Sequence, residues 1–344
     1  MHGWPRLLIA LAVGCSPPPP DDGGAPAPIE EPPGHATAFG VLDFGDAPEG
    51  LDGAEVVACA ACHPRHADEW RGSAHAAAAR DPLFLQEHSG DPFCTDCHAP
   101  RARDVAAEPE LAAVGVDCAT CHLRGGVVNA ARVSGDAPHP SVADPDRAAV
   151  GLCRTCHQFD FPRNPGVPMQ DTVREWEASG QDEGCVGCHA PHQDGHTDHR
   201  FLGHRDEALL ARALLVEASA ARDGWSTDVV LRLRAHDVGH SVPTGDVFRR
   251  LEVRAWVEGR PDNAASELLW RRFDIDQGVW TPAEDQRVPP PGQGERRVEL
   301  RIPDSGHRIV WAIDLWSVEP RLASRFDPGV QLHTRMVTGV IQVP

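Results

Sequence analysis

The pattern Cys-x-x-Cys-His occurs five times between positions 59 and 189. Two thiols three positions apart can form thioethers with the two vinyl groups of one haem, and this spacing is the attachment pattern of haem c. The histidine after the second thiol is then placed to bind the iron from its proximal side. The expected attachment thiols are Cys59, Cys62, Cys94, Cys97, Cys118, Cys121, Cys153, Cys156, Cys185 and Cys188, and the expected proximal ligands are His63, His98, His122, His157 and His189.

Other cysteine-based sites fit this pattern less well. Disulfides, the usual interpretation of an even set of cysteines in an exported chain, would not require a histidine after every second cysteine. Structural zinc uses such cysteine pairs two at a time, so five pairs would leave one pair over. Ten of the eleven cysteines lie in the motifs, and Cys15 is the eleventh. We therefore predict five covalently bound haem c groups, with their irons, as the cofactors.

Cys15 follows a segment typical of export. Residues 1–14 contain one arginine and an apolar run at positions 7–13, which is too short to span a bilayer but fits a secretory signal. The Gly-Cys pair resembles a bacterial lipoprotein box, with Ala12 in place of the preferred leucine, so Cys15 is the expected lipidation site. Ser16 resembles the outer-membrane sorting default. We expect a lipoprotein on the periplasmic side or the cell surface; an ordinary signal peptide with an incidental cysteine is the alternative.

Composition predicts the domain organisation. After the signal, residues 15–34 are rich in proline and glycine and form a tether. Residues 35–205 carry the motifs and are expected to be mostly α-helical or irregular, with haems in place of an aliphatic core. A connecting helix at 206–224 and an all-β, sandwich-like domain at 225–344 complete an α+β fold. The net charge of −19 argues against nucleic acid as a partner.

Local patterns place individual elements. Helical composition predicts helices over 66–80 and 170–179, the second with Asp171 as its cap and Gly180 at its end, and over 207–221. Apolar residues that alternate with charged ones predict strands in the last third of the chain. The predicted strands are 229–235, 251–257, 268–273, 298–302, 309–316 and 336–343.

A second axial ligand is expected for some or all of the irons, and one segment resembles a known source of such a ligand. Residues 70–75 read Trp-Arg-Gly-Ser-Ala-His and follow the first motif. They resemble the Trp-x-x-Ser-x-His segment of multihaem cytochromes of the c-554/c-prime type. In those proteins this histidine binds the iron of another haem. The resemblance covers most of residues 55–250 and implies that His75 is a distal ligand.

Further distal candidates come from the histidines outside the motifs. His196, His199 and His204 lie within nine residues of one another, and at least one is expected to be a ligand. Residues 239–245 look like a Gly-His-x-x-Pro-Thr-Gly loop found in β-domains of multihaem cytochromes, which implies that His240 is a ligand supplied across the two domains. His139, His88, His192 and Met169 are weaker candidates, and His66 is expected on a helix surface.

Two functions remain open from the sequence. The first is an electron-transfer protein that relays electrons between a donor and an acceptor protein, with the iron cycling between ferric and ferrous states. The second is a haem enzyme that acts on a small nitrogen oxide, hydroxylamine or peroxide at one open iron. The chain has no lysine and no tyrosine, which disfavours activities like those of pentahaem nitrite reductases and hydroxylamine oxidoreductases. The β-domain is a candidate for docking to a larger complex.

Overall fold

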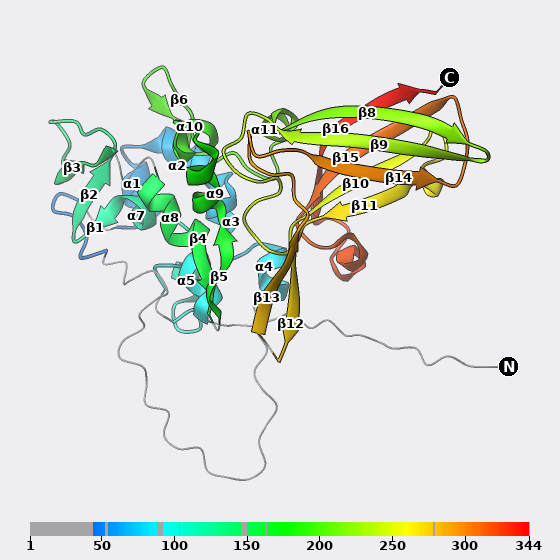
Figure 1. The fold of residues 1–344 in the computed structure, drawn as a ribbon. Helices are drawn as coiled ribbons and strands as arrows, with labels where there is room; N and C mark the ends of the chain where they lie inside the picture. Colours follow the sequence, from blue (N-terminus) through cyan, green and yellow to red (C-terminus); the bar gives the residue numbers. More distant parts are fainter. Residues whose placement is uncertain are drawn as a thin grey trace, which may run out of the picture.

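The computed structural model describes residues 44–51, 54–87, 92–102, 104–145, 150–162, 164–277 and 279–343. Cys15, His88 and the expected signal and tether lie outside these residues. The described chain has two parts, a motif region up to Asp206 and a β region from Glu207 (Figure 1). The predicted α+β class, with an irregular region before an all-β one, is confirmed.

Short helices and turns carry the motifs. Four of the five motif histidines are the last residue of a helix, and the fifth, His63, precedes one. The predicted helix over 66–80 is interrupted at Gly72 and Ser73, and the helix predicted from Gln170 starts at Thr172. The helices are α1 (Val56–Ala60), α2 (Pro64–Arg71), α3 (Ala74–Ala77), α4 (Pro82–Glu87), α5 (Pro92–His98), α6 (Pro109–Ala112), α7 (Cys118–His122), α8 (Leu152–His157), α9 (Thr172–Ser179) and α10 (Cys185–His189).

The motif region also contains short strands. Its buried apolar residues are few and mostly small. Six of its ten buried apolar residues, among those described, are alanines. Such a set cannot supply the large buried side chains on which a domain of this size normally depends. The strands are β1 (Leu123–Arg124), β2 (Val127–Ala130), β3 (Ser141–Ala143), β4 (Gln158–Phe161), β5 (Asn164–Asp171), β6 (His192–Gln193) and β7 (His196–Thr197).

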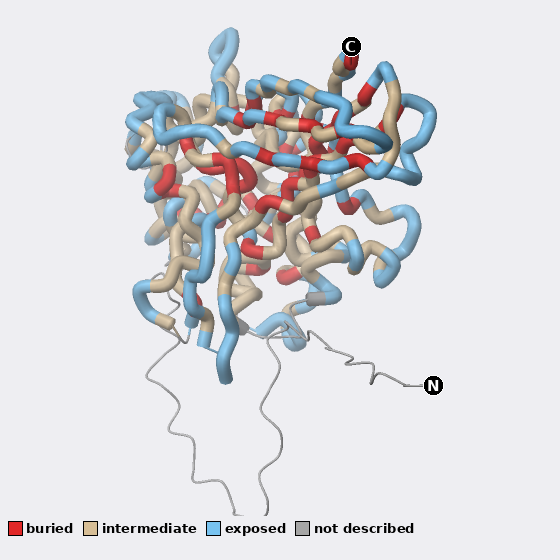
Figure 2. The backbone as a smooth tube through the Cα atoms, turned by 45° about the vertical axis from the view of Figure 1, so that its right-hand side comes forward, coloured by how far each residue is buried: buried red, intermediate tan, exposed pale blue. Residues whose placement is uncertain are grey.

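The β region is a sandwich of two antiparallel sheets, as predicted. One sheet has the order β11-β10-β15-β16 and the other β14-β9-β8. Alternate residues of β10 and β9 point inward and are fully buried, for example Leu251 and Val253 against Leu231 and Leu233. Figure 2 shows the buried stretches gathered along these strands. The strands are β8 (Leu214–Asp223), β9 (Ser226–Ala235), β10 (Arg250–Val257), β11 (Ala265–Leu269), β14 (Arg296–Ile302), β15 (Arg308–Trp316) and β16 (His333–Gln342).

The predicted connecting helix at 206–224 is wrong. Helix α11 spans only Glu207–Arg212, and the chain then continues as strand β8 (Leu214–Asp223). Its alanine-rich sequence favours a helix in isolation. Instead, β8 pairs with β9 along its whole length, and Leu214 is buried in the sandwich core. Tertiary packing therefore outweighs the helical propensity of this segment.

A hairpin of the β region reaches back to the motif region. Strands β12 (Arg271–Asp276) and β13 (Val279–Asp285) leave the sandwich and lie beside β5 (Figure 1). Trp280 stacks on Phe161 of β4 with ring centres 4.7 Å apart, and the Trp280 backbone N–H donates to the Asn164 side chain over 3.1 Å. These contacts hold the two regions together.

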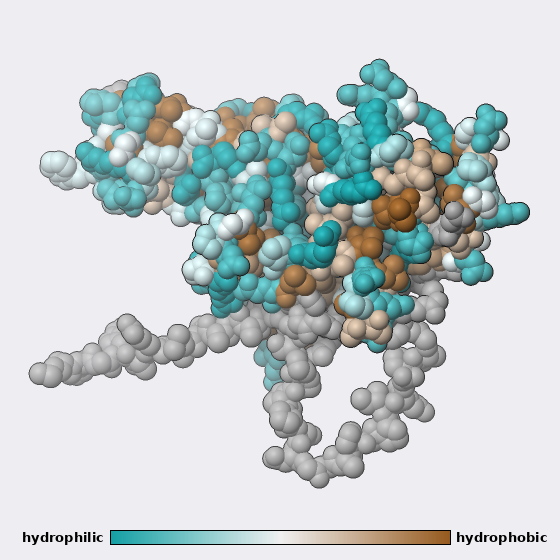
Figure 3. All heavy atoms as spheres, turned by 180° about the vertical axis from the view of Figure 1, so that it is seen from behind, coloured by the Kyte–Doolittle hydropathy of each residue, from teal (hydrophilic) through white to brown (hydrophobic). Residues whose placement is uncertain are grey.

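The outer surface is mixed in character. Seen from behind, most of the molecule is hydrophilic, with small separate hydrophobic groups (Figure 3). None of the described helices has the length and apolar composition needed to cross a membrane.

Candidate haem-binding sites

The structure fixes the orientation of three proximal imidazoles. The Nδ1 atoms of His98, His122 and His189 lie 2.9, 2.8 and 2.5 Å from the backbone oxygens of Ala78, Asn129 and Leu202. A carbonyl oxygen can only accept, so each Nδ1 carries the proton and donates it. Each Nε2 therefore keeps a lone pair for a metal, as is usual for metal-binding histidines.

Three other histidines lie opposite proximal imidazoles. The ring centres are 6.2 Å apart for His122 and His199, 6.3 Å for His189 and His240, and 6.4 Å for His75 and His157. An iron between two imidazoles is about 2 Å from each nitrogen, which puts the two ring centres roughly 6 Å apart. Each of these three pairs therefore has the separation needed to hold one haem iron from both sides.

Desolvation by the atoms packed around them suits these rings to a metal, although part of His157 is exposed. It lowers the pKa of His75 to about 4 and that of His157 to about 3, and it lowers the pKa values of His122 and His240 as well. The rings are therefore neutral at pH 7, as a metal ligand must be. The Nδ1 atoms of His199 and His240 donate to backbone oxygens, and Nδ1 of His75 is buried with no hydrogen-bond partner.

Comparison with known proteins agrees with this geometry. Residues 58–123 match the family model described as cytochrome c554 and c-prime. The structure resembles the crystal structure of a penta-heme cytochrome c552 from Thermochromatium tepidum, with a TM-score of 0.65 and 21% identity, over 86% of this chain and 100% of that one. No curated protein matches the sequence. The chain is a multihaem c-type cytochrome. Its haem c is covalently bound, and its function is redox chemistry based on the one-electron cycle of iron.

Residues 70–75, which resemble the Trp-x-x-Ser-x-His segment, are anchored next to the third motif. The Trp70 indole N–H donates to the Val116 carbonyl oxygen over 2.8 Å, and the Val116 N–H donates to the backbone oxygen of His75 over 3.0 Å. Ser73 caps the short helix α3 that carries His75. Val116 lies two residues before Cys118, so the same contacts position the third motif and His75, which lies opposite His157 of the fourth.

Three predicted ligands, His196, His139 and His204, do not form a facing pair with a motif histidine among the described residues. The Nε2 atom of His196 lies 2.9 and 2.8 Å from the two carboxylate oxygens of Glu69, so this nitrogen is already occupied. His139 contacts the Ser141 hydroxyl through Nδ1. Within the described part of the cytochrome, neither His139 nor His204 forms a ring contact with a motif imidazole, although His204 is half-buried and desolvation lowers its pKa to about 3.

Glu69 positions His199, which the sequence did not indicate. Besides His196, it accepts the backbone N–H of His199 over 2.9 Å. His66 was expected on a helix surface, but it is half-buried and packs against His196 and His199, with ring centres 4.4 and 4.7 Å away. Hydrogen bonds to Arg65, His196 and His199 hold the pKa of Glu69 at about 2 against its partial burial.

A second carboxylate, Glu175 of α9, holds the loop that carries His240. Its Oε2 accepts from the Ser241 N–H over 3.2 Å and from the Thr244 hydroxyl over 2.7 Å. Its Oε1 lies 2.6 Å from Nη1 of Arg287, and both side chains are buried. The loop is thus fixed across the boundary between the two regions, and no sequence pattern singled out Glu175 or Arg287.

Asp117 caps the helix of the third motif and ties it to the first. Its Oδ1 accepts from the backbone N–H and the hydroxyl of Thr120, and its Oδ2 accepts from Arg101 over 2.6 Å. Arg101 also donates to the Ala54 carbonyl oxygen, two residues before α1. Asp117 is buried, so its loss would also leave Arg101 without its anion.

We expect Asp117→Ala to destabilise this part of the cytochrome by about 3 kcal/mol, because the cap and a buried ion pair are lost together. Asp117→Asn keeps the cap, so it should be less destabilising than Asp117→Ala by about 1 kcal/mol. Hydrogen exchange of the 118–124 amides in the holoprotein measures the effect. The exposed Asp104→Ala is the control, and equal exchange rates in all three variants would contradict the role given to Asp117.

Proposed function

We propose that the protein is an exported pentahaem cytochrome that relays electrons between redox partner proteins. The observation that carries this proposal is the set of three facing imidazole pairs. An iron bound by two imidazoles has no free position for a substrate, so it can exchange electrons but cannot bind and convert a small molecule. Such ligation suits a relay.

The proposal places one haem at each motif and assigns a distal ligand to the haems of motifs 3, 4 and 5. His75 is the distal ligand opposite His157, His199 the one opposite His122, and His240 the one opposite His189. The pair separations support all three assignments, and the Nδ1 hydrogen bonds of His122, His199, His189 and His240 further support the second and third. The alanine-rich interior of the motif region supports a core formed by five porphyrins.

Contacts between motifs support a continuous path. Thiols of different motifs are hydrogen-bond neighbours: Cys59 of motif 1 with Cys118 of motif 3, Cys97 of motif 2 with Cys156 of motif 4, and Cys153 of motif 4 with Cys185 of motif 5. Cys121 of motif 3 and Cys153 of motif 4 interact electrostatically. The proposed order is therefore 1–3–4–5, with motif 2 branching from motif 4.

Location and partners follow from the haem attachment and the leader. Haem c is attached outside the cytoplasm, and residues 1–14 have the composition of an export signal. A lipid on Cys15 and the tether after it would hold the cytochrome at the outer membrane, within reach of a membrane-side donor. Its acidic surface, with a net charge of −19, suits a basic electron partner and disfavours nucleic acid.

Electron paramagnetic resonance of the oxidised holoprotein, with haem quantified against protein, tests the proposal. We expect five haems per chain and low-spin iron throughout. The imidazole planes of His75 and His157 are tilted by 61°, whereas the other two pairs are within 25° and 14° of parallel. The angle between axial imidazoles sets the splitting of the iron orbitals, so the tilted pair should give the most anisotropic of the three signals.

Two outcomes would contradict the proposal. A high-spin signal from one haem in the untreated protein would mark an open iron and favour an oxidoreductase that acts on nitrite, hydroxylamine, nitric oxide or peroxide. Fewer than five haems per chain would contradict the assignment of one haem to each motif.

A further inference from the structure

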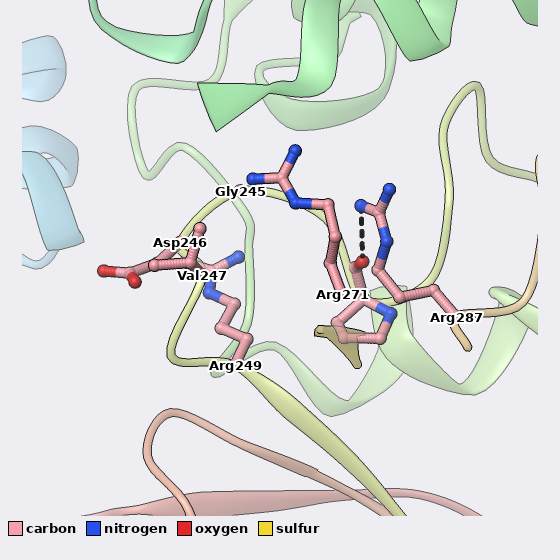
Figure 4. Close-up of a pocket in the computed structure, with 7 residues that line it drawn as sticks. Gly245, Asp246, Val247, Arg249, Arg271 and Arg287 are labelled. Atoms are coloured by element: carbon pink, nitrogen blue, oxygen red, sulfur yellow. Dashed lines mark hydrogen bonds between the residues drawn. The ribbon is translucent and has the colours of Figure 1, made fainter. Parts of the chain in front are cut away.

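Arg249 is a half-buried cation that forms no ion pair with a described carboxylate. It belongs to the loop that joins His240 to strand β10, and its guanidinium folds back to donate to the Thr244 carbonyl oxygen over 3.0 Å. In Figure 4 the side chain extends toward the backbone at Gly245. In the described part of the chain, no carboxylate forms an ion pair with Arg249, and the exposed Asp246 is its one favourable charged neighbour.

The surroundings make a missing anion more costly. Arg205, from the end of the motif region, is a second cation near Arg249, and both lie close to His204. One end of the Arg205 guanidinium pairs with Asp81 over 2.6 Å, while its buried Nε has no hydrogen-bond partner. Burial and Arg205 together lower the pKa of Arg249. A buried guanidinium among other cations is unfavourable unless an anion meets it. Gln170, whose side-chain oxygen is buried and unpaired, cannot supply the missing charge.

The position of Arg249 indicates which anion this is. It interacts electrostatically with His157 and with His240, which belong to two different facing pairs. It therefore lies beside two of the proposed irons, where the edge of a porphyrin would come. A haem carries two propionates at that edge, and arginine is well suited to pair with a carboxylate through two parallel hydrogen bonds. Covalent attachment keeps this carboxylate in place permanently.

We propose that Arg249, assisted by Arg205, binds a haem propionate at the junction of the two regions. This inference rests on the proposed ligation by His157 and His240. It gives the β region a second contact with the haem array, in addition to the imidazole of His240. A free anion such as phosphate or nitrite has the same charge, and the experiment separates the two sources.

A redox titration of the holoprotein, followed by optical and electron paramagnetic resonance spectra, tests the proposal. We expect Arg249→Gln to lower the midpoint potential of one bis-imidazole haem, because a positive charge beside a haem favours the reduced state. The ratio of reduced to oxidised iron should fall by up to about tenfold at fixed potential, which corresponds to about 59 mV for one electron. The low-spin signal that follows the shifted potential, tilted or near-parallel, identifies the haem concerned. In Arg249→Lys, which keeps the positive charge, the ratio of reduced to oxidised iron should stay within about twofold of the wild-type ratio.

The controls make each outcome decisive. Arg272→Gln removes an exposed arginine that pairs with Glu284 and should leave every potential unchanged. If Arg249→Gln fails to load haem, Arg205→Gln should lower the same potential by a smaller amount. Unchanged potentials in both variants would overturn the proposal. A wild-type potential that moves to the Arg249→Gln value when inorganic phosphate or nitrite is removed from the buffer would also overturn it, since the site would then hold a free anion.

Discussion

Replacing His240 with alanine should convert one haem of the cytochrome from low-spin to high-spin iron. His240 lies opposite His189 at 6.3 Å with nearly parallel ring planes, and no other described imidazole contacts His189. Water at the vacated position is a weak ligand, so the ferric iron becomes high-spin. We expect a high-spin resonance equal to about one haem per chain, together with the loss of one near-parallel low-spin signal.

A matched variant separates this effect from damage to the β region. His333→Ala removes a histidine of the same region that stacks on Trp316 and lies on β16, two strands away from β10 in the same sheet. It should leave the spectrum unchanged. A His240→Ala protein that keeps a fully low-spin spectrum with five haems would contradict the assignment of His240 as an axial ligand.

Replacing Asp314 with alanine should destabilise the sandwich by about 3 kcal/mol, the largest stability effect that we expect for a single polar residue of this region. Asp314 lies on the central strand β15 and is 0% exposed. It pairs with Arg254 of β10 over 3.1 Å and with Arg335 of β16. Its removal leaves two guanidiniums without their shared anion, and because they are 33% and 41% exposed, water compensates for part of the loss.

Asp228→Ala is the comparison for Asp314→Ala. Asp228 also pairs with an arginine, Arg301, over 2.9 Å, but both side chains are about half exposed. Exposed pairs contribute less than about 1 kcal/mol. Hydrogen exchange of the β10, β15 and β16 amides in the holoprotein measures both variants. Similar effects of the two substitutions would show that burial does not set the strength of these pairs.

The local part of the site could be predicted from sequence, and the long-range part could not. The thiols and the proximal histidine of each motif follow from a spacing of five residues. The histidine opposite a motif histidine lies 51 positions away for His189 and 82 positions away for His157, so spacing carries no information about it. His196 and His199 are three residues apart, yet Glu69 occupies the ring nitrogen of one and only the backbone of the other.

The fold shows the same division. Strands β10 and β14 were predictable because alternation of apolar and charged residues marks a half-buried strand. Strand β8 was not, because its alanines and leucines favour a helix and only pairing with β9 makes them a strand. Hairpin β12–β13 was seen only in part, since its packing on Phe161 depends on a neighbour more than a hundred residues away.

The loop that carries His240 links two folding units through a metal ligand. Under the proposed ligation, the bond from His240 to iron is also a contact that holds the β region to the motif region. Ferric and ferrous haem iron differ in their affinity for imidazole. By thermodynamic linkage, the free energy of association of the two regions then changes by the same amount when that iron is reduced. A protein that docks on the β region and shifts it relative to α9 could therefore tune the potential of this haem without touching it.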